Sequence, residues 1–160
     1  MEPLELWIEM ARVICRRASN HDDVPMLQKL SSLKFYDELR LWPIWVVWDA
    51  IQLLLCRAPE LQTLTFEFTH QCRSQCSGPD NGLKTLDVPE CMSSHLTTIH
   101  YKGFSEYEME LVEQILKEAK VLKTMKTTVE SDLDSKLKLR IHKKIMKFPR
   151  ASQNCQIAFD

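Results

Sequence analysis

One pattern of apolar residues recurs along the chain: an apolar residue, two spacers, an apolar residue, one spacer, and an apolar or aromatic residue. Its second position falls at residues 33, 64, 99, 125 and 157, so the copies lie 26 to 35 residues apart. Such spacing is typical of one supersecondary unit repeated as in a solenoid. The last two apolar positions of a copy are two residues apart, which is the period of side chains on one face of a strand. The copies are Leu30-x-x-Leu33-x-Phe35, Leu61-x-x-Leu64-x-Phe66, Leu96-x-x-Ile99-x-Tyr101, Leu122-x-x-Met125-x-Thr127 and the weaker Ile157-x-Phe159, with Asn154 in its first position.

Helical patterns separate these predicted strands. One runs from Pro43 to Arg57, a second is capped by Ser105 with Glu108 completing a capping box, and a third spans about Asp132 to Lys147. Alternation of strands and helices predicts an α/β fold with a parallel sheet and right-handed crossovers. The apolar stripes are Ile44, Trp48, Ile51 and Leu55; Met109, Val112, Ile115, Leu116 and Ala119; and Leu137, Ile141, Ile145 and Phe148.

Two further segments carry local signals. The stretch from Leu4 to Arg17 has an amphipathic helical period, which predicts an N-terminal helix with Leu6, Met10, Val13 and Ile14 on its apolar side. The segment from Gln71 to Asp87 contains Ser77-Gly78-Pro79-Asp80-Asn81-Gly82, a dense turn signal. We expect this segment to be the most mobile internal loop.

Composition limits the class of protein. With 44% hydrophobic and 27% charged residues, the chain has the composition of an ordinary globular domain. A formal net charge of −1 gives no overall attraction to nucleic acid or to anionic lipid. No secretory signal or membrane-spanning run is visible, so we expect a cytoplasmic or nuclear protein with its six cysteines as thiols.

An ordered series of blocks occupies the end of the chain. The blocks are Val88-Pro89-Glu90-Cys91, Leu96-x-x-Ile99-x-Tyr101-x-Gly103, the run from Glu108 to Met125, and Phe148-Pro149-Arg150-Ala151-Ser152-x-x-Cys155-Gln156-Ile157-x-Phe159. Their order and spacing resemble the FBD domain of plant F-box proteins that also carry leucine-rich repeats. The resemblance predicts a short irregular solenoid of the leucine-rich-repeat type over residues 1–87, capped by an FBD domain over residues 88–160.

The resemblance implies a non-catalytic protein-interaction module, the substrate-recognition region of receptors in SCF-type ubiquitin ligases. In that family an F-box binds the Skp adaptor of a cullin ligase, but no F-box pattern occurs between Met1 and Leu30. The sequence is therefore a fragment, a truncated gene model, or an FBD protein without the ligase-docking module. Contact with the Skp adaptor is expected only if an F-box is supplied elsewhere. The alternative is a stand-alone repeat protein that binds targets without any ligase.

Binding residues are predicted where strand positions alternate with the buried ones. These positions should lie on the exposed face of the sheet, either as contact residues or as ordinary solvated residues. Trp45 falls opposite the apolar stripe of its helix and is a candidate binding anchor, unless another unit covers it. The strand candidates are Lys34, Tyr36, Thr65, Glu67, His100 and Lys102.

A zinc site is a weaker alternative. Cys72-x-x-x-Cys76 and Cys91-x-x-x-His95 supply ligand types that suit tetrahedral zinc. The opposing interpretation makes Cys91 a small buried residue, and it is the one we favour. We therefore expect no metal and no cofactor.

A basic run marks the third helix: Lys136, Lys138, Arg140, Lys143, Lys144, Lys147 and Arg150. Such a run suits nucleic acid or an acidic membrane, but no aromatic residues interleave for base stacking. A solvated face or a patch for an acidic protein fits better, so neither nucleic acid nor membrane is expected as a partner. Phosphate-binding glycine-rich and Gly-x-Ser-x-Gly motifs are lacking, and we expect no enzymatic activity.

Overall fold

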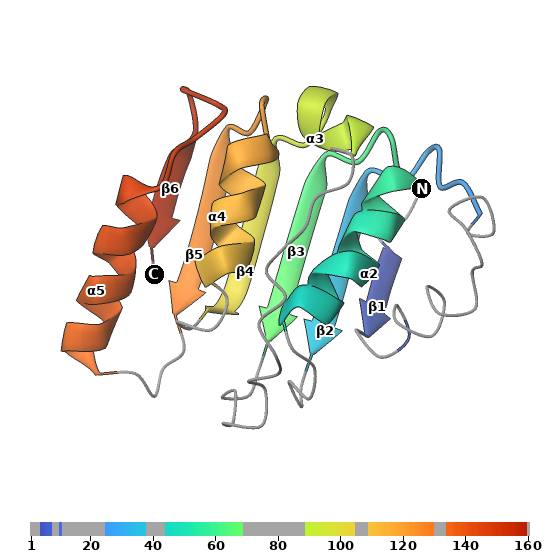
Figure 1. Cartoon of the computed structure of the whole chain (residues 1–160). Helices are drawn as coiled ribbons and strands as arrows, with labels where there is room; N and C mark the ends of the chain where they lie inside the picture. Colours follow the sequence, from blue (N-terminus) through green and yellow to red (C-terminus); the bar gives the residue numbers. More distant parts are fainter. Residues whose placement is uncertain are drawn as a thin grey trace.

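A computed structural model of the chain describes residues 4–7, 10, 25–37, 44–68, 89–104, 109–129 and 134–159. A six-stranded parallel sheet, with its strands in chain order from β1 to β6, forms one layer (Figure 1). The strands are β1 (Leu4–Trp7), β2 (Ser32–Asp37), β3 (Thr63–Phe68), β4 (Thr98–Phe104), β5 (Thr124–Val129) and β6 (Gln156–Phe159).

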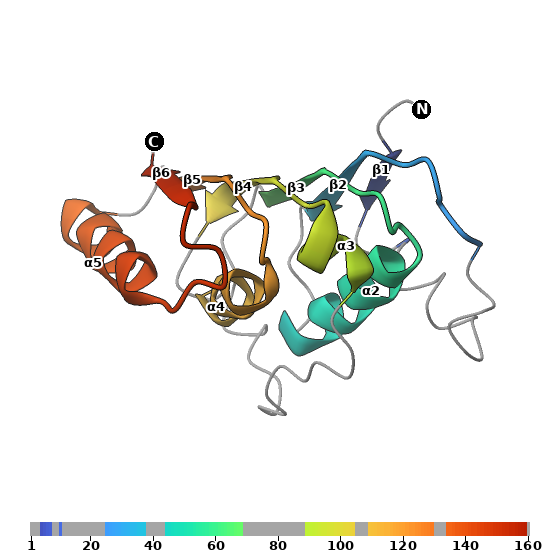
Figure 2. The same ribbon diagram turned by 90° about the horizontal axis from the view of Figure 1, so that it is seen from above.

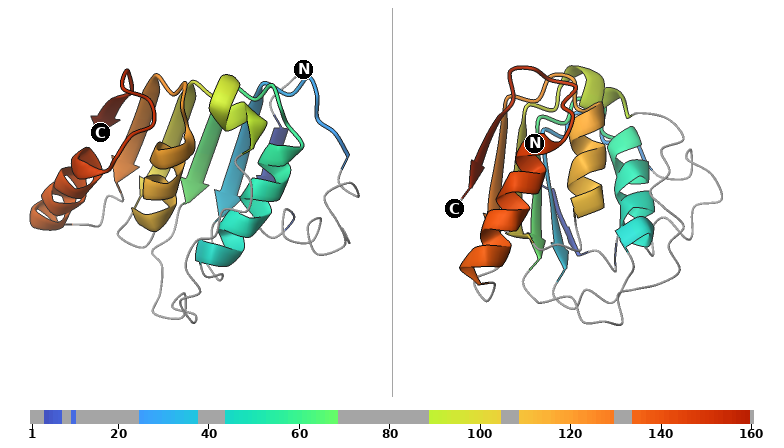
Figure 3. Two further views of the ribbon diagram at one scale, coloured as in Figure 1. Left: turned by 45° about the horizontal axis from the view of Figure 1, so that its top comes forward. Right: turned by 60° about the vertical axis from the view of Figure 1, so that its left-hand side comes forward.

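Helices form the second layer. The helices are α2 (Ile44–Cys56), α3 (Glu90–Ser94), α4 (Met109–Glu118) and α5 (Ser135–Lys147). Figure 2 shows α2, α4 and α5 on one side of the sheet, and the right panel of Figure 3 shows α2 and α4 on this same side. The three crossovers that contain α2, α4 and α5 thus return on the same side, as expected of a leucine-rich-repeat-like α/β solenoid. Within the described part of the chain, no helix has both the length and the apolar composition that crossing a bilayer requires.

The predicted repeat is confirmed in register. The second apolar positions pair across the sheet as Leu33↔Leu64, Leu64↔Ile99, Ile99↔Met125 and Met125↔Ile157. The first positions of the four stronger copies precede the strands and are buried, whereas Asn154 in the weaker copy is exposed; the buried ones are Leu30, Leu61, Leu96 and Leu122. Because each copy of the pattern contributes one side chain to a continuous apolar row, neighbouring units complete each other's core.

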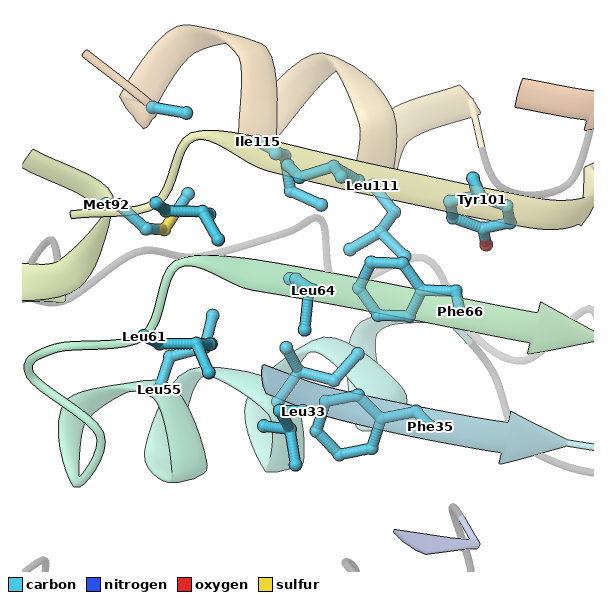
Figure 4. Packing of buried hydrophobic residues seen from close by; sticks show 14 of the residues in the cluster. Leu33, Phe35, Leu55, Leu61, Leu64, Phe66, Met92, Tyr101, Leu111 and Ile115 are labelled. Carbon is cyan, nitrogen blue, oxygen red and sulfur yellow. The ribbon is translucent and has the colours of Figure 1, made fainter. Parts of the chain in front are cut away.

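Aromatic side chains build the next row of the core. The rings of Phe35 and Phe66 stack with centroids 5.9 Å apart, and those of Phe66 and Tyr101 are 5.0 Å apart and tilted (Figure 4). Contacts of this geometry stabilise beyond their buried area. The row changes at Thr127, which is fully buried and donates its hydroxyl hydrogen to the carbonyl oxygen of Ala158 at 3.2 Å. That hydrogen bond satisfies a polar group in an apolar position.

The turns before β3, β4 and β5 repeat one hydrogen-bond arrangement. The carbonyl oxygen of Ser31 accepts from the amides of both Gln62 and Thr63, and the carbonyl oxygen of Gln62 accepts from those of Thr97 and Thr98. The carbonyl oxygen of Thr97 accepts in the same way from the next unit, at Lys123 and Thr124. These shared acceptors keep successive units aligned along the edge of the sheet and satisfy backbone groups outside the strands.

The helices bury the predicted stripes. On α2, the side chains of Trp48, Ile51 and Leu55 are fully buried. On α4, the buried residues include Leu111 as well as the predicted Val112, Ile115 and Leu116, and Leu111 and Ile115 approach the sheet in Figure 4. On α5, Ile141 and Ile145 are buried, while Leu137 and Phe148 are partly buried. The N-cap of α5 is Asp134, whose carboxylate accepts from the Leu137 amide at 2.7 Å.

The helix predicted over Leu4–Arg17 is wrong at its start. Leu4–Trp7 is strand β1, which pairs in parallel with β2 through Leu4↔Leu33 and Leu6↔Phe35. Pairing buries Leu6 in the shared core, a gain that outweighs a helical period over so few residues. The repeat itself carried the signal, because Met1-x-x-Leu4-x-Leu6 has the spacing of the other copies. Of the remaining segment only Met10 is described, and Gln71 to Asp87 lies outside the described residues.

The blocks of the FBD resemblance have structural roles. Pro89 and Cys91 are buried around the short helix α3, which the sequence did not predict, and the Cys91 thiol donates to the Leu55 carbonyl oxygen at 3.7 Å. Gly103 has φ of 78° where the pairing of β4 and β5 shifts register, a conformation that favours glycine. The buried Ser152 hydroxyl donates to the Leu122 carbonyl oxygen at 2.6 Å. These contacts join α3 and the last turn to the repeats.

Replacement of Ile99 by alanine should lower the free energy of unfolding by about 2–4 kcal/mol, because it empties a fully buried site in the central row. Lys143→Ala, at an exposed position of α5, should change it by no more than about 0.5 kcal/mol. Urea unfolding of the two variants and the parent chain measures both values. The opposite ranking would contradict the core described here.

Loss of the Ser152 hydroxyl should also destabilise the chain. Ser152→Ala should cost about 1–2 kcal/mol, because it leaves the Leu122 carbonyl oxygen without its donor in a buried place. The matched control is Ser135→Ala, at an exposed position, which should be near neutral. Thermal unfolding of both variants tests the difference, and equal melting temperatures would show that Ser152 does not tie the last turn to the repeats.

Candidate functional site

The sheet face opposite α2, α4 and α5 is the candidate site, and we call it the open face (Figure 2). Its side chains are the outward residues of β2 to β5, which alternate with the buried rows. None of the described helices lies over this face in Figures 2 and 3. The open face consists of Ser32, Lys34, Tyr36, Thr63, Thr65, Glu67, Thr98, His100, Lys102, Thr124, Lys126 and Thr128.

Strand register brings all six predicted strand residues together. Lys34, Thr65 and His100 form one row, since Lys34 pairs with Thr65 and Thr65 with His100. Tyr36, Glu67 and Lys102 form the adjacent row in the same way. All six side chains are partly buried, so each presents some of its surface to solvent while its neighbours hold it in place.

One ion pair bridges the two rows. The Lys34 ammonium lies 2.7 Å from the Glu67 carboxylate oxygen Oε2 and 4.6 Å from the centre of the Tyr36 ring. The three side chains therefore form a fixed cluster that combines a charged hydrogen bond with a cation–π contact.

This pairing moves both pKa values away from neutrality. The hydrogen bond from Lys34 holds the pKa of Glu67 below its ordinary value, with Lys102 and His100 adding to the effect and partial burial opposing it. The hydrogen bond to Glu67, supported by Tyr36, raises the pKa of Lys34. Both groups are charged at neutral pH, and the cluster presents a fixed pattern of charge.

Sequence reasoning missed two parts of the open face. Lys126 extends the Lys34 row and Thr128 extends the Tyr36 row on β5. Ser32, Thr63, Thr98 and Thr124 make a third row of hydroxyl groups. The same alternation that identified the other residues would have found these, had it been applied to every strand position.

Trp45 does not belong to this cluster. It lies on α2, on the helical side of the sheet, and its side chain is outside the described part of the structure. Trp48 is fully buried, as predicted. A binding role for Trp45 would therefore concern a surface other than the open face.

The four zinc candidates are only partly described. Burial raises the pKa of the Cys91 thiol to about 12, which disfavours the thiolate that a metal needs. His95 makes a 2.7 Å hydrogen bond between its Nδ1 and the Ser94 hydroxyl, and Cys72 and Cys76 lie outside the described residues. Among described residues, no three His, Cys, Asp or Glu side chains gather in a way that could hold a metal ion. Cys91 and Cys155 are free thiols.

Comparison with known proteins identifies relatives in plants. The FBD family model matches residues 84–126. The chain is 34% identical over 142 residues to the F-box/FBD/LRR-repeat protein At4g00160 of Arabidopsis thaliana, covering 82% of this chain and 30% of that protein. It is 34% identical over 147 residues to the F-box/FBD/LRR-repeat protein At3g52680 of the same plant, covering 84% and 30%. The chain thus spans about 30% of the length of these relatives. No solved structure matches the chain.

Breaking the Lys34–Glu67 pair should raise the pKa of Glu67 toward its ordinary value. Lys34→Ala removes the largest cause of the lowered pKa, and an NMR titration of the Glu67 carboxyl measures the change. Lys120→Ala, an exposed lysine in the turn after α4, is the control and should leave the Glu67 titration in place. An unchanged Glu67 titration in Lys34→Ala would contradict the pairing.

The same pair should make a small, pH-dependent contribution to stability. Because the folded-state pKa of Glu67 is lowered, the contribution is present above its unfolded pKa and is lost as the pH falls through the folded-state pKa. A double-mutant cycle of Lys34→Ala and Glu67→Ala at neutral pH should give about 0.2–1 kcal/mol for this partly exposed pair. Repeating the cycle in acid should reduce the coupling, and a coupling that grew in acid would contradict the assignment.

Proposed function

The chain is a relative of the plant F-box/FBD/LRR-repeat proteins, and from this premise we propose that it is a non-catalytic protein-interaction module that binds its target on the open face. The observation that carries the proposal is the assembly of Lys34, Tyr36 and Glu67 into one preformed cluster on a polar side of the sheet that none of the described helices covers. A rigid parallel sheet presents such groups in fixed rows, so little conformational entropy is lost on binding. Thr65, His100 and Lys102 complete the proposed contact surface.

The electrostatics of the cluster favour recognition over acid–base chemistry. A group that transfers protons works best with a pKa near the working pH. The lowered pKa of Glu67 and the raised pKa of Lys34 move both groups in the opposite direction. Fixed charges of this kind instead set specificity and orientation toward a partner.

In the longer relatives, the F-box and leucine-rich repeats named in their descriptions accompany a region like this chain. We therefore propose a substrate-recognition role related to the receptors of SCF-type ubiquitin ligases, with contact to the Skp adaptor made only through an F-box. The division into residues 1–87 and an FBD domain at 88–160 is part of this proposal. A stand-alone interaction role, in which the open face binds a target without any ligase, remains the second candidate.

Affinity capture from plant extract tests the open face when a matched pair of variants is used. The triple variant Tyr36→Ala, Glu67→Ala, Lys102→Ala should reduce target retention by at least about tenfold, because it removes central contact groups. The control triple Glu110→Ala, Lys117→Ala, Lys120→Ala changes exposed residues on α4 and the turn after it, and it should retain the target like the parent chain.

Thermal unfolding shows whether both triple variants are folded. Equal retention of the target by the two folded variants would place the binding surface elsewhere. A pull-down with purified Skp adaptor tests whether this chain docks to a ligase by itself. Retention of the adaptor would link this chain directly to a ligase, and failure to retain it would remove direct ligase membership for this chain while leaving target binding intact.

A further inference from the structure

The outward side of α5 combines cations with exposed apolar side chains. Residues at steps of three and four lie on one side of a helix, and here they are opposite the buried Ile141 and Ile145. Leu139 is 54% exposed and Met146 is 47% exposed, and the two residues are seven positions apart, which is about two helical turns. We call this surface the α5 outer face, and it consists of Lys136, Leu139, Arg140, Lys143, Met146 and Lys147.

Its charge pattern is unlike that of an ordinary solvated helix. The sequence of α5 contains no acidic residue, and it places the cations Lys143 and Lys147 four residues apart. Like charges at this spacing destabilise a helix. On α4, by contrast, Glu113 and Lys117 form a favourable pair at the same spacing, 3.6 Å apart. The α5 arrangement thus has an energetic cost in the free protein that an anionic partner would offset.

A neighbouring side chain holds the apolar part in position. The Arg150 guanidinium donates to the Cys155 carbonyl oxygen at 3.0 Å and approaches the Met146 sulfur at 3.6 Å. Arg150 thereby extends the cationic surface beyond the end of α5 and orients Met146. The outer face therefore presents an anchored thioether and a leucine between positive charges.

We propose that the α5 outer face is a docking surface for an acidic amphipathic segment of a partner protein, with Leu139 and Met146 receiving its apolar side chains. Charge complementarity selects an anionic partner. A membrane is disfavoured because the apolar side of α5 that would enter lipid is already buried as Ile141 and Ile145. Nucleic acid would make no favourable apolar contact with the exposed Leu139 and Met146. An acidic amphipathic helix matches both the positive charges and the apolar side chains of this surface.

Fluorescence anisotropy with a defined probe tests the proposal on the full chain. The probe is a labelled helical peptide of about 20 residues made of Glu and Ala, with two leucines seven residues apart. It should bind the parent chain, and binding should weaken as salt screens the charges. Lys136→Glu together with Lys143→Glu should weaken binding at least about tenfold. The same variant should melt at a higher temperature, because it places Glu beside Arg140 and Lys147.

Two matched variants separate charge from apolar contact. Lys120→Glu with Lys123→Glu makes the same change of net charge at exposed positions outside α5, and it should bind the probe nearly as well as the parent chain. Leu139→Gln with Met146→Gln keeps every charge of α5. It should weaken binding of the leucine probe several-fold, while leaving unchanged the weaker binding of an otherwise identical probe with alanine in place of leucine.

Three results would overturn the proposal. The first is an equal loss of probe binding in the α5 charge variant and in the control charge variant. That result would show that probe binding depends on the net charge of the chain and not on the α5 outer face. The second is tighter binding to a DNA duplex of about 20 base pairs than to the peptide. The third is tighter binding to vesicles containing about one-third phosphatidylserine.

Discussion

Parallel pairing in register between repeated units is the constraint on which the remaining structure depends. A single unit contributes one strand and one helix and cannot enclose its own apolar side chains. The row through Leu33, Leu64, Ile99 and Met125 exists only because each strand pairs with the next at the same position of the repeat. The shared carbonyl acceptors at Ser31, Gln62 and Thr97 fix that alignment before each strand begins.

The same register determines the composition of the open face. Inward and outward residues alternate, so a slip of one residue in any strand would exchange the core with the surface. Lys34 and Glu67 lie on neighbouring strands, and Glu67 is one outward position further along its strand than the residue that pairs with Lys34. The pairing of the buried rows that contain Leu33 and Phe66 enforces this relation, so the two side chains meet. The open face is thus a consequence of the core, and its charges need no flexible loop to position them.

Sequence periodicity predicted β2 to β6 and the three long helices because each has several apolar residues at a fixed spacing. β1 was missed because Leu4 to Trp7 is too short to distinguish a period of two from a helical one, and only pairing with β2 decides it. Helix α3 was missed because its five residues carry no period. The six strand residues of the candidate site followed from alternation, whereas the Lys34–Glu67 contact depends on register between strands, which one strand's sequence does not contain.

The open face and the α5 outer face differ in how their exposed charges are compensated. On the open face, Lys34 is neutralised internally by Glu67, so this cluster is stable without a partner and offers a specific shape more than a net field. On α5 the cations have neighbours of the same sign within the helix, so the surface offers a net field and gains stability when an anion is bound. Because the open face and α2, α4 and α5 lie on opposite sides of the sheet, a partner on one surface leaves the other accessible (Figure 2). A target held on the sheet and an acidic segment held on α5 are therefore geometrically compatible on a single chain.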